Sequence, residues 1–336
     1  MHYIVRNLTT FQIKKILIIR LSSLGDVILT EPLCRALREK HPDAQIDFLV
    51  KKEFAEIVSL FGSISNVITY DEKMSGSEYD VVLDVHNVLR SKRIRSKFGK
   101  NVHVINKRTF KRWLLVTFKI NLLRDSPDVV ERYFETAKEL GVSDRGNAPK
   151  IELKNVIKHK RVALCPGAKH WNKRWPPERF AEAARAFAAK GFEIEIHGSS
   201  GESAIAEEVI RVAGLPIINQ CGKYSLTELA RHLAECEVAI TNDSGLMHLC
   251  NALGLTTISI FGPTVNEFGF FPFNPFTSII IEEKGLECRP CTTIGSDRCP
   301  KGHFKCMKNI TVERVMLAYD LQLSILNNMV DKNNIL

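Results

Sequence analysis

Short apolar runs of strand type alternate with helix-type segments twice along this chain of 336 residues. The first set of runs covers residues 14–22, 45–50, 66–70, 79–86 and 102–106. The second set covers residues 161–167, 192–198, 216–222, 237–243 and 256–262. Alternation of this kind predicts a parallel sheet covered on both faces by helices. Its repetition predicts an α/β chain of two doubly wound, Rossmann-like lobes that face a central cleft.

We place the lobes at residues 1–155 and 156–310, and we expect a helix over 311–336 that packs back on the N-terminal lobe. No apolar run reaches the length of a membrane span, and the first residues lack the apolar core of a signal peptide. We therefore expect a cytoplasmic protein.

The first candidate site follows the first strand. Ser22, Ser23 and Gly25 form a short loop, and a helix is expected from Asp26 to about Lys40. Open α/β sheets bind ligands at the carboxyl ends of their strands, where Gly25 allows close approach and Asp26 offers a carboxylate. Alternatively, Asp26 only stabilises the helix N-terminus. The loop lacks the GxGxxG and GxxxxGK[ST] spacings, which counts against a dinucleotide-dependent enzyme.

The second candidate site lies in the strand, turn, helix, strand unit at 241–264. Asp243 ends a strand, and Ser244 and Gly245 precede a helix expected over 245–253. Free backbone N–H groups and the helix dipole suit a diphosphate there. The alternative is that Asp243 or Ser244 is only a helix cap.

Positive charge is concentrated in the N-terminal half. Residues 1–150 hold 26 Lys and Arg against 18 Asp and Glu, and the block from Arg90 to Arg112 holds ten basic residues and no acidic one. Such a block favours phosphate, nucleic acid or anionic lipid as a partner, and we find no nucleic-acid-binding motif. The mixture of apolar and basic residues at 108–124 fits a membrane-surface helix, or a core helix whose cations extend to solvent.

Two smaller features complete the site candidates. His86 and Arg90 follow the strand at 79–86, where His86 contacts an acceptor molecule or is a satisfied core histidine. Near the C-terminus, four cysteines have the spacing C-x2-C-x7-C-x6-C, with His303 as a spare ligand: Cys288, Cys291, Cys299 and Cys306. They predict a structural zinc or iron site, or else four reduced loop cysteines.

Four motifs, in order, resemble glycosyltransferase family 9, the lipopolysaccharide heptosyltransferases: RLSSLGDVILTEPLCRALRE, PGAKHWNKRWPPERFAEAARAF, NDSGLMHLCNALG and IFGPT. The resemblance covers nearly all of residues 14–312. It implies a GT-B fold with an acceptor-binding N-terminal lobe and a nucleotide-sugar-binding C-terminal lobe. It also implies inverting transfer from ADP-heptose to the lipid A-linked inner core, without a catalytic metal, at the anionic face of the inner membrane.

The resemblance assigns roles to individual residues. Asp26 matches the general base, and the matches to donor-binding residues are Lys173, Asp243, Ser244, Gly245 and His248. Beside Lys173, Arg174 offers a second cation for the leaving diphosphate, which makes it a further donor-binding candidate. The acceptor-binding candidates are Ser22, Ser23, Gly25, His86 and Arg90. Cysteine clusters that hold iron occur in some family members. This chain has Asn219 or Gln220 where some members place an acidic residue for the ribose. One alternative is a transferase of this family that uses another nucleotide sugar or a protein acceptor. The other is a two-lobed ligand-binding protein without catalysis.

Overall fold

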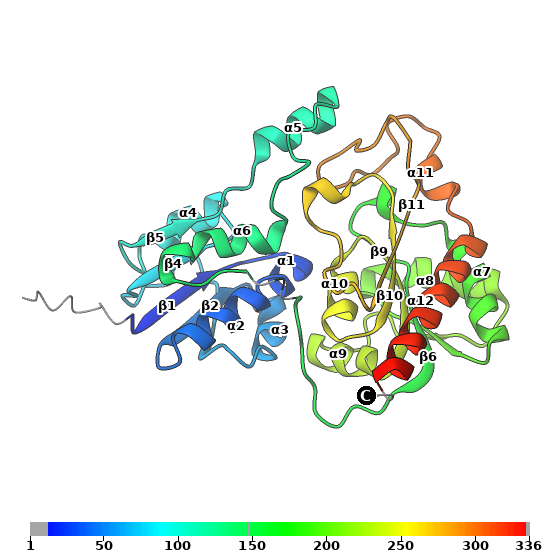
Figure 1. The fold of residues 1–336 in the computed structure, drawn as a ribbon, viewed down its shortest axis with the longest axis horizontal. Coiled ribbons are helices and arrows are strands. Elements are labelled where there is room, and N and C mark those ends of the chain that lie inside the picture. Colours follow the sequence, from blue (N-terminus) through cyan, green and yellow to red (C-terminus); the bar gives the residue numbers. More distant parts are fainter. Residues whose placement is uncertain (1–12, 145, 147, 334–336) are drawn as a thin grey trace, which may run out of the picture.

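The computed structural model describes residues 13–144, 146 and 148–333, which form two α/β lobes (Figure 1). Each lobe has one parallel sheet with helices packed on it. The expected pair of doubly wound lobes is therefore confirmed. No helix among the described residues is long and apolar enough to cross a membrane.

The N-terminal sheet has the strand order β3-β2-β1-β4-β5, and its pairs are parallel. The central strand β1 (Lys15–Ile19) is fully buried from Ile16 onward, as expected of a strand covered on both faces. The remaining strands are β2 (Gln45–Val50), β3 (Asn66–Thr69), β4 (Val81–Asp84) and β5 (Val102–Val104).

The C-terminal sheet repeats this order with one more strand, as β11-β10-β9-β6-β7-β8. Its strands are β6 (His159–Cys165), β7 (Glu193–Ile196), β8 (Ile218–Asn219), β9 (Cys236–Asn242), β10 (Thr256–Phe261) and β11 (Ser278–Glu282). Our sequence analysis missed β11. This edge strand alternates buried and exposed side chains, and its run of three isoleucines was the available signal.

We predicted one helix from Asp26 to Lys40. This prediction was wrong in one respect, because the segment forms two helices. These are α1 (Leu24–Ile28) and α2 (Glu31–Lys40). Pro32 stands in the first turn of α2, where a residue without an amide proton is tolerated, so a new helix begins there. The break turns α1 into a short element that presents its N-terminal loop to the other lobe.

The other helices of the N-terminal lobe are α3 (Ala55–Ser59), α4 (Leu89–Arg95), α5 (Thr109–Phe118) and α6 (Val129–Thr136). Those of the C-terminal lobe are α7 (Pro177–Ala189), α8 (Ser203–Ala213), α9 (Leu226–Ala234), α10 (Gly245–Ala252) and α11 (Lys305–Lys308). α10 agrees with the helix expected over 245–253.

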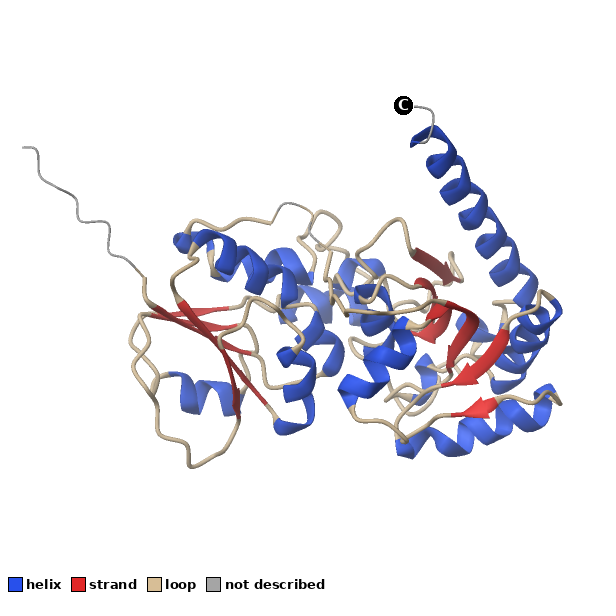
Figure 2. Ribbon diagram, turned by 90° about the horizontal axis from the view of Figure 1, so that it is seen from below, coloured by secondary structure: helices blue, strands red, loops and turns tan. Residues whose placement is uncertain are grey.

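The last helix, α12 (Val312–Asn333), packs on the C-terminal lobe rather than on the N-terminal lobe (Figure 2). Its buried face belongs to the core of that lobe, where the Tyr319 ring meets Phe187 with centroids 5.0 Å apart. Lys190 pairs with Asp320 at 2.9 Å on the same side. The buried side of α12 therefore packs against α7 and β11 of the C-terminal lobe.

The lobes meet where α1 and α10 lie together (Figure 1). A Cβ atom added to Gly25 would lie 2.6 Å from His248 Cδ2, and one added to Gly245 would lie 2.9 Å from Leu24 Cβ. Both distances are too short for real Cβ contacts. Glycine at these two positions therefore sets how closely the two candidate ligand loops approach each other.

We predict that Gly25→Ala lowers the free energy of unfolding by about 1–3 kcal/mol, because the methyl group overpacks the junction against buried His248. The measurement is denaturant unfolding at equilibrium. Gly62→Ala is the matched control, since no atom lies within 4 Å of an added Cβ there. Equal unfolding curves for both variants would contradict the tight junction.

Candidate active site

Asp26 stands in the first turn of α1, with its carboxylate held from two sides. Arg20 Nη2 lies 2.6 Å from Oδ1, and the Ser23 hydroxyl donates to Oδ2 at 2.8 Å. Burial alone would raise the pKa of Asp26, but the charge of Arg20 and the hydrogen bonds from Ser23 outweigh burial and lower it. The carboxylate is therefore ionised at neutral pH and free to accept a proton.

Arg20 is a site residue that our sequence analysis missed. It follows β1 directly, is 7% exposed, and donates from Nη1 to the Val85 carbonyl at 2.7 Å. It thus fixes Asp26 to the carboxyl edge of the sheet. Its position at a strand end was the only signal, because helical or strand periodicity does not connect it to Asp26.

The acceptor candidates lie in different surroundings. Ser23 is exposed and contacts Asp26, whereas Ser22 is half-buried and Gly25 is buried in the lobe junction. His86 Nδ1 accepts a hydrogen bond from the Leu21 N–H at 3.1 Å. Burial and the charges of Arg20 and Lys107 lower the pKa of His86 to about 3, so the ring is neutral and satisfied on one side.

Arg90 is exposed near the start of α4. Among the described residues, no hydrogen bond or ion pair joins its guanidinium to the Asp26 loop. Arg90 therefore belongs to the basic surface of the lobe rather than to the immediate surroundings of Asp26.

Three further cations of this lobe make no salt bridge with any described residue: Lys107, Arg112 and Arg132. The charge of Asp26 acts on Lys107 and Arg112. Arg132 is 4% exposed and donates only to carbonyl oxygens, including that of Phe268 at 3.0 Å. Burial lowers the pKa of all three, to about 10 in Arg112. Buried positive charge without a carboxylate partner is costly, so this face of the cleft suits an anionic ligand.

On the C-terminal side, Asp243 and Lys173 form an ion pair. Lys173 Nζ lies 2.6 Å from Asp243 Oδ2, and the Thr264 hydroxyl donates to the same oxygen at 2.7 Å. The Asp243 carboxylate therefore orients Lys173 and does not cap α10. Our alternative of a simple helix cap is wrong for this residue.

Ser244 is the N-cap residue of α10, but its side chain does not cap the helix either. Its hydroxyl is buried and has no hydrogen-bond partner among the described residues. A buried hydroxyl without a partner is unfavourable, whereas a bound anion at the helix N-terminus would accept from it.

His248 links the two sides electrostatically. Burial lowers its pKa to about 4, and its charged neighbours include Asp26 from one lobe and Asp243 and Lys173 from the other. The ring is therefore neutral at physiological pH. Its position shows that the two predicted loops come together at one junction, as expected.

Glu202 lies at the carboxyl edge of the second sheet, where it closes a capping box with Ser199. Its carboxylate accepts from Ser199 N at 2.7 Å and lies so close to Gly167 that an added Cβ would clash with it. The side-chain oxygen of Asn219 accepts a hydrogen bond from the Cys221 amide. Arg174, a predicted donor-binding residue, donates to the Ala168 carbonyl at 2.9 Å.

Two of the four C-terminal cysteines, Cys288 and Cys291, line a surface hollow of about 730 Å³ together with His303 and Lys119. Cys288 Sγ lies 3.8 Å from His303 Nε2. Burial, and then the neighbouring thiol of Cys291, raise the pKa of Cys306 to about 12. These side chains are close enough to interact, but no three of their described ligand atoms lie within 4.8 Å of one another.

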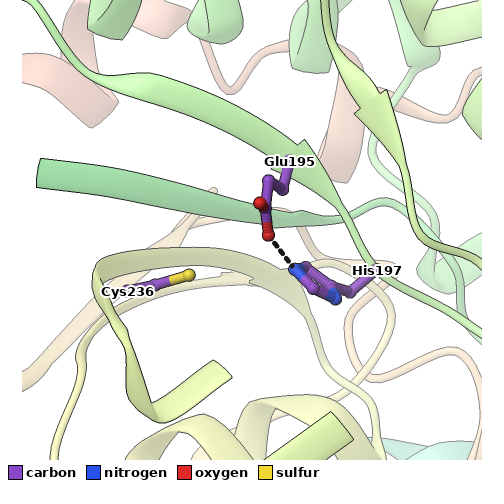
Figure 3. A group of neighbouring side chains, drawn as sticks. All are labelled: Glu195, His197 and Cys236. Carbon is purple, nitrogen blue, oxygen red and sulfur yellow. Dashed lines mark hydrogen bonds and ion pairs between the residues drawn. The ribbon is translucent and has the colours of Figure 1, made fainter. Parts of the chain in front are cut away.

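The one described set that meets this limit is Glu195, His197 and Cys236, which are buried in the C-terminal sheet (Figure 3). His197 Nε2 lies 3.1 Å from Glu195 Oε2. Arg161 Nε lies 3.3 Å from the other Glu195 oxygen. Since Arg161 already balances the carboxylate and would repel a cation, the contacts fit a buried polar network better than a metal site.

Comparison with known proteins identifies relatives of the chain. Residues 67–298 match the model of glycosyltransferase family 9 (heptosyltransferase). Lipooligosaccharide heptosyltransferase 2 of Campylobacter jejuni is 27% identical, over 87% of this chain and 93% of the relative.

Solved structures share the fold. The glycosyl transferase family 9 structure from Veillonella parvula has a TM-score of 0.75 and 22% identity, and covers 92% of this chain and 97% of its own. Escherichia coli heptosyltransferase WaaC with ADP has a TM-score of 0.71 and 22% identity, with coverages of 92% and 99%. The iron-containing E. coli glycosyltransferase TibC has a TM-score of 0.62 and 15% identity, with coverages of 94% and 77%.

Proposed function

Since this chain belongs to glycosyltransferase family 9, we propose that it transfers a heptose from ADP-heptose to the lipid A-linked inner core of lipopolysaccharide, with inversion at the anomeric carbon. Its relatives include a heptosyltransferase solved with ADP-2-deoxy-2-fluoro heptose and a lipooligosaccharide heptosyltransferase, which supports this donor and acceptor. The observation that carries the proposal is the junction of α1 with α10, which brings the loop of Asp26 close to the loop of Asp243 and its partner Lys173.

The proposed chemistry assigns one task to each side of the junction. The acceptor oxygen bonds to the anomeric carbon as the bond from that carbon to the diphosphate oxygen breaks, and ADP leaves with the electron pair. Asp26 takes the proton of the acceptor hydroxyl. Lys173, Arg174, Ser244 and the α10 N-terminus stabilise the leaving diphosphate. A single carboxylate that acts as a base, without a second that acts as a nucleophile, favours inversion.

The charges of the N-terminal side support an anionic acceptor. Lys107, Arg112 and Arg132 have no carboxylate partner among the described residues, and phosphate or carboxylate groups of an inner-core acceptor would supply one. We place the enzyme in the cytoplasm, at the anionic face of the inner membrane, with Ser22, Ser23, Gly25, His86 and Arg90 on the acceptor side.

The first test concerns Asp26. We expect Asp26→Asn to reduce turnover by about 10²–10⁴-fold, because the amide keeps the shape of the carboxylate but cannot accept a proton. Turnover is measured by product mass after incubation with ADP-heptose and truncated core acceptors. ADP affinity, measured by calorimetry, should stay near the wild-type value.

The outcome of this assay separates the alternatives. Wild-type turnover in Asp26→Asn would remove Asp26 as the base. Product formed only from another nucleotide sugar, or only on a protein, would redirect the substrate assignment. ADP binding without transfer to any acceptor would favour a two-lobed binding protein.

The second test concerns Lys173. We expect Lys173→Ala to weaken ADP binding by about 10–100-fold, because a charge-assisted hydrogen bond to the diphosphate is lost. Lys284→Ala removes an exposed lysine of the same lobe and is the control for net charge. Unchanged ADP affinity in Lys173→Ala, with normal thermal unfolding, would mean that this lysine serves only Asp243.

We also propose that Cys288, Cys291, Cys299 and Cys306 hold a structural zinc or iron ion, with His303 as a replacement ligand. Thiolates and imidazole are the ligands that such sites use, and the distance of 3.8 Å between Cys288 Sγ and His303 Nε2 supports the assignment. A bound ion would fix the loop around 288–306 and would have no role in the transfer step.

Protein purified without a metal-affinity tag should contain close to one zinc or iron per chain by elemental analysis. The double variant Cys288→Ser/Cys291→Ser should lose both the metal and thermal stability, because a structural site contributes its binding energy to folding. Cys34→Ala/Cys221→Ala removes two thiols elsewhere and should keep the metal. Metal-free wild-type protein would leave these four residues as ordinary loop cysteines.

A further inference from the structure

Segment 110–122, which includes most of α5, exposes an unusual amount of apolar surface. Its exposed large side chains, with exposed fractions, are Phe110 (67%), Trp113 (47%), Phe118 (57%), Ile120 (49%) and Leu122 (50%). Leu115 is the buried residue of α5. We call the five exposed residues Phe110, Trp113, Phe118, Ile120 and Leu122 the α5 patch. A contiguous exposed apolar patch usually marks an interaction surface.

The aromatic rings of the α5 patch pack on each other. The ring centroids of Phe110 and Trp113 are 5.8 Å apart, and those of Trp113 and Phe118 are 5.3 Å apart. About half or more of each of these side chains still faces water, so their mutual contact leaves a compact apolar surface on α5. This helix lies at the top of the view in Figure 1.

The opposite side of α5 is firmly held. Arg112 donates to the Thr293 carbonyl at 2.8 Å and lies over the Phe268 ring at 4.8 Å. Lys119 donates to the Pro290 carbonyl at 2.6 Å and to the Cys288 carbonyl at 3.1 Å. These bonds cross from the N-terminal lobe to the C-terminal lobe, so the outward direction of the α5 patch is fixed by the fold.

The charge around the α5 patch selects the partner. Residues 90–124 contain no Asp or Glu, and exposed basic residues lie within or next to this segment at Lys111 and Arg124. Aromatic rings with flanking cations are the composition of segments that sit in the headgroup region of an anionic bilayer. An acidic protein surface would match the cations but would leave the exposed rings in water.

We propose that the α5 patch enters the headgroup region of an anionic lipid bilayer and is the apolar anchor of this enzyme. The inference rests on the proposed function in one respect, since a lipid-linked acceptor lies in such a bilayer. Arg112, on the other side of the same helix, is among the charges that surround Asp26. The anchor would therefore hold the cleft close to the membrane surface, where the sugar chain of a lipid-linked acceptor begins.

Vesicle binding tests the anchor without any substrate. The full chain is mixed with vesicles of phosphatidylcholine alone, or of phosphatidylcholine with phosphatidylglycerol, and bound protein is measured by co-sedimentation. Binding should require phosphatidylglycerol. Lipids brominated on their acyl chains should quench part of the tryptophan fluorescence, and Trp113→Phe should bind equally well but lose that quenching.

A matched pair of variants tests the patch itself. Phe110→Ser/Trp113→Ser/Phe118→Ser should weaken vesicle binding at least about tenfold. Phe276→Ser/Leu317→Ser/Leu321→Ser removes equally exposed apolar side chains of the C-terminal lobe and should bind as the wild type does. Circular dichroism checks that both variants are folded.

Three results would overturn the proposal: no quenching in the wild type, equal loss of binding in both triple variants, or a patch variant that turns a dimer into a monomer without vesicles. The last result would make the α5 patch a contact between copies of the chain. None of these readouts involves sugar transfer, so a failed transfer assay would overturn the proposed function and leave the anchor standing.

Discussion

The close contact of α1 with α10 is the constraint on which the candidate site depends. At Gly25 and Gly245 there is no room for a side chain between the helices, so the loops after β1 and β9 lie close together. Both loops stand at the carboxyl edges of parallel sheets, which is where such sheets bind ligands. A two-lobed chain without this contact would have two separate loops, and neither could act on a substrate held by the other.

Charge is distributed unevenly across that contact. On the C-terminal side, Lys173 and Asp243 balance each other, and His248 is neutral because it is buried. On the N-terminal side, Asp26 is balanced by Arg20, while Lys107 and Arg112 have no carboxylate partner among the described residues. An anion that enters from the N-terminal side therefore completes a charge balance, whereas one on the C-terminal side must share Lys173 with Asp243.

The sequence predicted the parts of this site that depend on local pattern. The strand ends at Asp26 and Asp243 and the helix after Gly245 follow from apolar runs and turn residues only a few positions apart. Arg20 was not predictable in this way, because its role comes from contacts across the sheet and between loops. The break between α1 and α2 was visible in Pro32 but was outweighed by the helical pattern around it. The packing of α12 depends on which lobe offers a complementary apolar face, and that is a tertiary property.

The lobes are joined at a second place, and the two junctions differ in polarity. At α1 and α10 the contact is close packing around two glycines. At α5 and α6 the side chains of Leu115, Leu123 and Phe268 form an apolar cluster, and a Cβ added to Gly269 would lie 2.7 Å from Asp128 Cα. Cations of these helices also donate hydrogen bonds to carbonyl oxygens at 268–293. Close packing therefore holds both junctions, and the second adds positive charge that no carboxylate of the described residues balances in a salt bridge.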